Sequence, residues 1–158
     1  FSDASSHGIS AGPEHIAILD TTWLTEQGQP ATQDSGRQAE IHTWLGSPNE
    51  TVPNPAVAQR LAAGDQACLH TYSNGHTCIH TSAAEITNLT PTTLRRLIDF
   101  YYHTLMAFLG SDKTFLHITP PVTHITTPLG KIGAARLFAS AIQCPYVLLG
   151  DEGRDELN

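Results

Sequence analysis

The stretch CLHTYSNGHTCIHT, residues 68–81, combines two short strand-like runs with a turn signal between them. The runs at residues 68–72 and 77–81 flank Asn74-Gly75. Both central positions of a type I′ turn need positive φ, and Asn-Gly is the dipeptide that best tolerates this. We therefore predict a β-hairpin near residues 68–81 with Asn74 and Gly75 at its tip.

Strand and helix patterns alternate along the rest of the chain. Short apolar runs predict strands at residues 15–19, 115–119 and 146–149. Apolar spacing, Pro and Gly predict helices at residues 37–45, 55–61, 91–109 and 131–142. Alternation without an internal repeat is typical of the α/β class, so we expect a mixed or mostly parallel sheet with flanking helices.

Length and charge narrow the function classes. A chain of 158 residues and 17.0 kDa fits one domain over residues 1–158, and a first residue other than Met suggests a processed form or a fragment of a longer chain. The formal net charge of −7 argues against nucleic-acid or anionic-membrane partners, because polyanion binding needs clustered cations. No apolar run approaches the roughly 20 residues that span a bilayer. We expect a soluble protein, and three cysteines favour a reducing, cytoplasmic location over a secreted one.

Polar residues follow the predicted strands at several places. Asp20 follows the first strand, Ser73 the second, and Asp151 with Asp155 the last, while Lys131 opens a predicted helix. Ligands of α/β proteins gather beyond the carboxyl ends of the strands, where loops and helix starts converge. We expect these residues to meet in one site.

Four segments in this order resemble the haloacid dehalogenase superfamily of phosphohydrolases: Ile18-Leu19-Asp20-Thr21-Thr22, Tyr72-Ser73-Asn74-Gly75, Gly130-Lys131 and Gly150-Asp151-Glu152-Gly153-Arg154-Asp155. The resemblance implies a Mg²⁺-dependent phosphatase that hydrolyses a small phosphorylated substrate through an aspartyl-phosphate.

The same resemblance assigns a role to each residue. Asp20 would be the nucleophile, Ser73 would hydrogen-bond the phosphoryl oxygens, and Lys131 would neutralise their charge. Mg²⁺, which prefers oxygen ligands, would be held by Asp20, Asp151 and Asp155. Thr22 stands where the family usually has an Asp that acts as general acid and base.

A second resemblance covers the hairpin. Residues 70–79 and Leu89-Thr90-Pro91 are similar to the segment around the active-site Cys of ubiquitin-conjugating enzymes. This resemblance implies that Cys78 forms a thioester and that His70 or Asn74 stabilises the oxyanion. A non-catalytic binding or assembly domain, with an unspecified protein partner, is the alternative from another class.

His76, Cys78 and His80 alternate, so on a strand they share one face. Imidazole and thiolate are Zn²⁺ ligands, and such a site would need a further ligand from elsewhere. The default expectation for Cys78 is a buried core thiol, slow to alkylate and without stoichiometric Zn²⁺.

Overall fold

The computed structural model describes residues 12–21, 37–46, 50–81, 90–118 and 139–143. Its sheet contains β1 (Ile16–Asp20), β2 (Ala67–Thr71), β3 (Thr77–Thr81) and β4 (Phe115–His117), in the order β2-β3-β1-β4. β1 is parallel to β3 and to β4, whereas β2 is antiparallel to β3. The mixed sheet and the α/β class are therefore confirmed.

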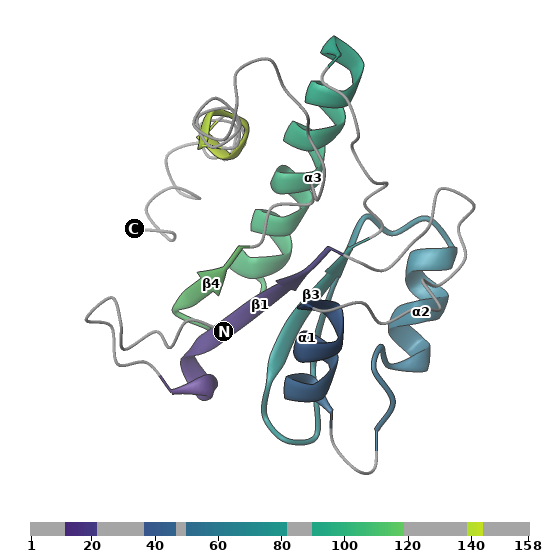
Figure 1. Ribbon diagram of the computed structural model, residues 1–158, viewed down its shortest axis with the longest axis vertical. Helices are drawn as coiled ribbons and strands as arrows, with labels where there is room; N and C mark the ends of the chain where they lie inside the picture. Colours follow the sequence, from purple (N-terminus) through teal and green to yellow (C-terminus); the bar gives the residue numbers. More distant parts are fainter. Residues whose placement is uncertain (1–11, 22–36, 47–49, 82–89, 119–138, 144–158) are drawn as a thin grey trace.

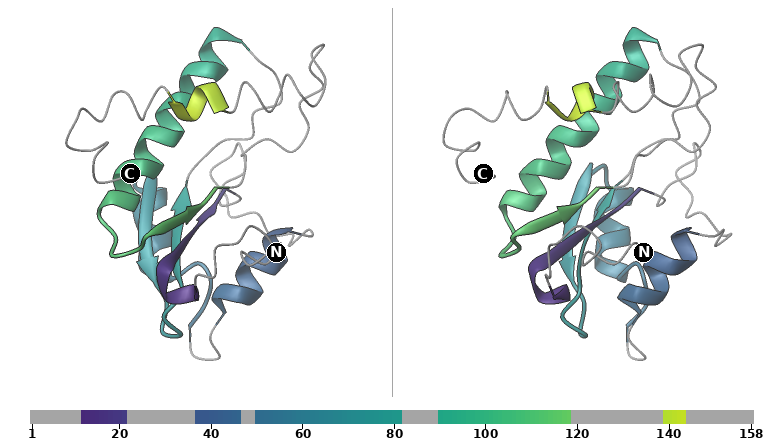
Figure 2. Two further views of the ribbon diagram at one scale, coloured as in Figure 1. Left: turned by 90° about the vertical axis from the view of Figure 1, so that its left-hand side faces the viewer. Right: turned by 60° about the vertical axis from the view of Figure 1, so that its left-hand side comes forward.

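Helices cover both faces of this sheet (Figure 1, Figure 2). α1 (Arg37–Leu45) and α2 (Pro55–Ala62) lie on one face, and α3 (Pro91–Leu109) lies on the other. Asn54 caps α2, and Thr90 begins α3 with a capping box that satisfies backbone N–H groups of the first turn. All three helices were predicted. The predicted helix 131–142 falls within the described residues only from residue 139 on, and residues 139–143 are helical.

Alternate residues of the two central strands supply the two cores. Toward α3, the buried side chains are Ala17, Leu19, Ile79, Leu97, Phe100, Tyr101, Phe108 and Ala141. Toward α1 they are Ile18, Ile41, Leu45, Tyr72 and Cys78. Successive side chains of a strand point to opposite faces, so β1 and β3 are buried on both sides. No described helix is both long enough and apolar enough to span a membrane.

The hairpin is confirmed, but its turn differs from the prediction. The Tyr72 N–H donates to the His76 carbonyl and the Gly75 N–H donates to the Tyr72 carbonyl, both at 2.8 Å, which makes a three-residue loop. Gly75 has φ +84°, and no described residue other than glycine has positive φ, so the type I′ prediction for Asn74 is wrong. The pattern matches a three-residue hairpin loop that ends in a left-handed glycine.

Side-chain bonds explain the conformation of Asn74. Its Oδ1 accepts a hydrogen bond from the His76 N–H at 3.0 Å, and its Nδ2 donates to the Leu45 carbonyl at 3.1 Å. Asn commonly bonds the backbone two residues ahead in this way. The turn therefore also caps the last carbonyls of α1.

Gly75→Val is expected to lower the free energy of unfolding by about 1–3 kcal/mol, because a β-branched residue is strained at positive φ. A Cβ at position 75 would meet no atom within 4 Å, so the loss would come from the backbone alone. Gly75→Asn is the matched control and should lose less, since Asn tolerates this region. Equal losses for Val and Asn in denaturant titrations would contradict the assignment.

Candidate metal centre

Asp20 lies at the carboxyl end of β1, beside His80 in the register of β3. Both side chains are fully buried. Asp20 Oδ2 accepts a hydrogen bond from His80 Nδ1 at 2.9 Å, and His80 Nε2 lies 2.8 Å from the Tyr72 hydroxyl oxygen. A carboxylate only accepts, so Nδ1 carries a proton in this arrangement. Asp20, His80 and Tyr72 therefore form a buried row of hydrogen-bonded side chains.

Neighbouring groups form hydrogen bonds with Tyr72 and Asp20, the two outer residues of this row. The Asn54 backbone N–H donates to the Tyr72 hydroxyl oxygen at 3.2 Å, and the Thr81 hydroxyl donates to the Asp20 carbonyl at 2.9 Å. From α1, His42 Nε2 lies 3.5 Å from Asp20 Oδ2. Two imidazoles from different elements therefore face one buried carboxylate.

Cys78 completes a cluster of possible metal ligands. A carboxylate oxygen of Asp20, the Cys78 Sγ and a ring nitrogen of His80 all lie within 4.8 Å of one another, and all three residues are buried. Burial, and then the charge of Asp20, raises the pKa of the Cys78 thiol well above its ordinary value. Without a cation nearby, this sulfur is a neutral thiol.

His76, the third residue of the predicted zinc set, is not part of this cluster. Its ring stacks on Trp44 with centroids 3.8 Å apart, and its Nδ1 lies 2.6 Å from the Trp44 carbonyl oxygen. His76 precedes β3 and faces the end of α1, where it helps cap that helix. Asp20, from the neighbouring strand, takes the place that the sequence suggested for His76.

Ser73 lies at the other end of the sheet from Asp20. The register pairs Asp20 with His80, near the carboxyl end of β3, while Ser73 lies in the turn that precedes β3. The reason is the antiparallel direction of β2, whose carboxyl end lies at the amino ends of β1 and β3. The structure therefore does not bring Asp20 and Ser73 together. Thr22, Lys131, Asp151 and Asp155 lie outside the described residues, so their convergence with Asp20 stays a prediction.

The environment of Cys78 bears on the thioester hypothesis. Cys78 is fully buried, as expected for a core thiol. A nucleophilic Cys needs an accessible thiolate, which a buried thiol of raised pKa does not provide. His70 Nε2 is bonded to Glu50 Oε1 at 2.8 Å, and Asn74 is bonded to α1. Neither is directed to an oxyanion at Cys78.

Sequence reasoning missed a second acid–histidine pair, formed by Glu50 and His70. Glu50 Oε1 also accepts from Asn54 Nδ2 at 2.8 Å, and Glu50 Oε2 accepts from the Ser73 N–H at 2.9 Å. These bonds, with His70 first and then Ser73, lower the pKa of Glu50 from 4.5 to about 2. Glu50 thus connects the hairpin to the start of α2 through these hydrogen bonds. No local motif signals it, because its partner His70 is 20 positions away.

Glu50→Gln is expected to destabilise the fold by about 1–2 kcal/mol at pH 7, since hydrogen bonds to a charged group are lost. The pKa of Glu50 is lower in the folded state, so its stabilisation is present above about pH 4.5 and is lost as the pH falls toward 2. The gap between wild type and variant should therefore close over that window.

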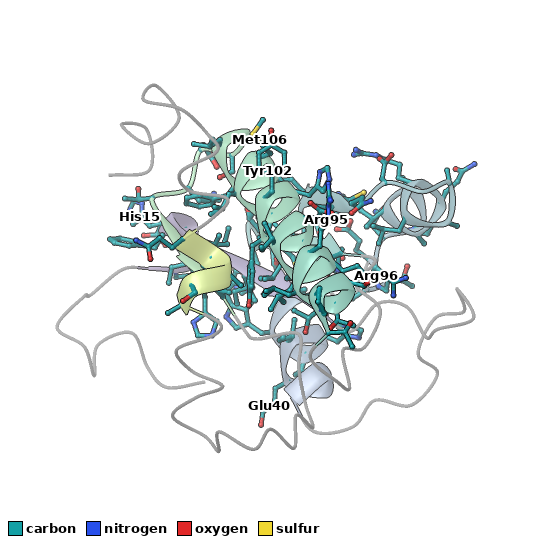
Figure 3. The ribbon with its side chains drawn as sticks, turned by 90° about the horizontal axis from the view of Figure 1, so that it is seen from above. His15, Glu40, Arg95, Arg96, Tyr102 and Met106 are labelled. Atoms are coloured by element: carbon teal, nitrogen blue, oxygen red, sulfur yellow. The ribbon has the colours of Figure 1, made fainter. Side chains whose placement is uncertain are left out.

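Glu40→Gln is the matched control for this pH dependence. Glu40 is exposed on α1 and points away from the sheet (Figure 3). Its replacement should change stability by less than about 0.5 kcal/mol. Urea titrations from pH 7 to pH 2 measure both variants, and a gap for Glu50→Gln that stays constant with pH would refute the role of its charge.

Comparison of the chain with protein-family models, curated proteins and solved structures finds no match. The chemistry of the buried cluster is therefore the basis for a function.

Proposed function

We propose that this chain is a transition-metal-binding domain in which Asp20, Cys78 and His80 hold one Zn²⁺. The observation that carries the proposal is the convergence of three different ligand types within 4.8 Å in the interior. Zn²⁺ accepts sulfur, imidazole nitrogen and carboxylate oxygen in one site, whereas Mg²⁺ prefers oxygen ligands and bound water.

Charge balance supports a buried dication here. A Cys78 thiolate and an Asp20 carboxylate together carry two negative charges, which neutralise Zn²⁺. Burying a neutral assembly avoids the large desolvation cost of an unpaired ion. The two anionic ligands come from adjacent parallel strands, so the ion would join β1 to β3.

The hydrogen bonds of His80 support the same assignment. If Nδ1 binds the ion, the ring proton moves to Nε2, which then donates to the Tyr72 oxygen 2.8 Å away. Metal-binding imidazoles are commonly oriented by such a partner on the other nitrogen. Tyr72 is therefore a positioning residue for His80, and Asn54 in turn holds Tyr72.

The burial of all three ligands favours a structural role for the ion. Catalytic zinc sites keep a position open to substrate, whereas structural sites are closed. The proposed function is therefore metal binding that stabilises the fold.

Cobalt binding tests the proposal. Chelator-treated protein titrated with Co²⁺ should bind roughly one equivalent and show a thiolate-to-cobalt charge-transfer band. Cys78→Ser should abolish that band and weaken Zn²⁺ binding at least 10-fold, because a ligand is lost. Absence of a charge-transfer band in the wild type would refute the site.

Cys68→Ser is the matched control. Cys68 is also fully buried, and its neighbours are Val57, Leu61 and the Asp65 carboxylate, to which its Sγ donates at 3.8 Å. It is not a member of the three-residue cluster. The Cys68→Ser variant should keep the cobalt band, and its loss would contradict the choice of Cys78.

A second candidate is the Mg²⁺-dependent aspartyl-phosphate chemistry. The observation that favours it is the position of Asp20 at the carboxyl end of a parallel strand, where ligands of α/β proteins gather. It predicts Mg²⁺-dependent hydrolysis of p-nitrophenyl phosphate that is lost in Asp20→Asn. Absence of hydrolysis by the wild-type protein would remove this candidate and leave the zinc proposal unaffected.

A further inference from the structure

His42 is the second imidazole that faces the buried carboxylate of Asp20. It belongs to α1, and its Nε2 is buried 3.5 Å from Asp20 Oδ2. The side chain as a whole is 16% exposed, so it lies between the interior and the surface. Its neighbour Ile41 and the following Leu45 pack against Ile18 and Cys78 of the sheet.

We infer that His42 is the fourth ligand of the ion and that metal binding thereby couples α1 to the sheet. This inference rests on the proposed function. Zn²⁺ in closed sites is almost always bound by four ligands in a tetrahedron. Asp20, Cys78 and His80 supply three from the strands, and His42 adds a nitrogen from the helical layer.

The present position of His42 shows that its side chain must move when the ion binds. The group of ligand atoms within 4.8 Å of one another contains Asp20, Cys78 and His80 and does not include His42. His42 must therefore approach Cys78 and His80 when it joins the ion. Because His42 lies in the middle of α1, this bond would tie the helix to the sheet.

The carboxyl end of α1 is already attached to the hairpin. Asn74 Nδ2 donates to the Leu45 carbonyl, and His76 Nδ1 lies 2.6 Å from the Trp44 carbonyl oxygen. A bond from His42 to the ion would thus restrain the middle of a helix whose carboxyl end is already bonded to the hairpin. We therefore expect the hydrogen-exchange protection of α1 to increase when Zn²⁺ binds.

Hydrogen exchange with and without Zn²⁺ tests the coupling in the full chain. In the wild type, saturating Zn²⁺ should slow exchange at least 10-fold both in β3 and in residues 37–45. In His42→Ala at saturating Zn²⁺, exchange should slow in β3 but not in residues 37–45. The cobalt charge-transfer band should persist in this variant, because Cys78 is still a ligand.

Two further variants keep the result interpretable. His42→Cys supplies another zinc ligand and should restore the protection of residues 37–45. His103→Ala removes a half-buried imidazole from α3, on the other face of the sheet, and should behave as wild type.

The outcomes separate the two proposals. Equal protection of residues 37–45 in wild type and His42→Ala would overturn the role of His42 and leave the three-ligand site intact. No cobalt band in the wild type would overturn the site itself. If His42→Ala does not fold, failure of His42→Cys to protect residues 37–45 would overturn the coupling.

Discussion

Replacing His80 by alanine is expected to lower the free energy of unfolding of the metal-free protein by about 3–5 kcal/mol. His80 is the buried partner of the Asp20 carboxylate, at 2.9 Å, and both residues are inaccessible to solvent. Removing one partner of a buried ionic or charge-assisted pair leaves the other charge less well compensated in a medium of low polarity. The Tyr72 hydroxyl would lose one of its two partners at the same time and keep the bond from the Asn54 N–H.

Urea titration in the presence of a chelator measures this effect without any contribution from a bound ion. Asp20→Asn in the His80→Ala background should restore part of the lost stability, because the buried charge that lost the His80 hydrogen bond is then absent. A loss below about 1 kcal/mol for His80→Ala, or simple additivity of the two substitutions, would contradict the importance of the pair.

The second large effect is expected for Leu97→Ala, at about 2–5 kcal/mol. Leu97 is fully buried on α3 and belongs to the cluster with Ala17, Leu19 and Ile79 on the central strands. Deleting its three outer carbon atoms removes apolar burial and leaves a cavity. The effect therefore measures how firmly α3 is packed on the sheet.

Met106→Ala is the control on the same helix. Met106 is 46% exposed and lies with Tyr102, Arg95 and Arg96 along the outward side of α3 (Figure 3). Its replacement should cost less than about 1 kcal/mol, because little of its surface is buried. Similar losses for Leu97→Ala and Met106→Ala in denaturant titrations would mean that α3 does not pack as described.

The fold class followed from local sequence patterns. The Pro and Gly at the ends of α2 and α3, and the apolar runs of β1 and β3, lie where elementary preferences place them. The turn at Gly75 was located correctly but given the wrong type. Its geometry depends on the long-range bonds of Asn74 to α1, which no local pattern contains.

The candidate site was only partly predictable. Cys78 and His80 are two residues apart on one strand, so their shared face follows from the strand period. Asp20 joins them because β1 and β3 are adjacent and parallel, with Asp20 opposite His80. His42 and Tyr72 come from other elements, and their approach depends on tertiary packing. Ser73 was misplaced because the phosphatase resemblance put it in one site with Asp20, whereas the predicted hairpin makes β2 antiparallel to β3 and so places Ser73 at the other end of the sheet.

The central claim is that Asp20, Cys78 and His80 bind a metal ion together. X-ray absorption at the zinc edge of the Zn²⁺-loaded protein tests it most directly. One sulfur at about 2.3 Å and nitrogen or oxygen ligands at about 2.0–2.2 Å are expected. In the Cys78→Ser variant the sulfur shell should disappear, while in Cys68→Ser it should be unchanged. A zinc spectrum with only nitrogen and oxygen ligands in the wild-type protein would contradict the site.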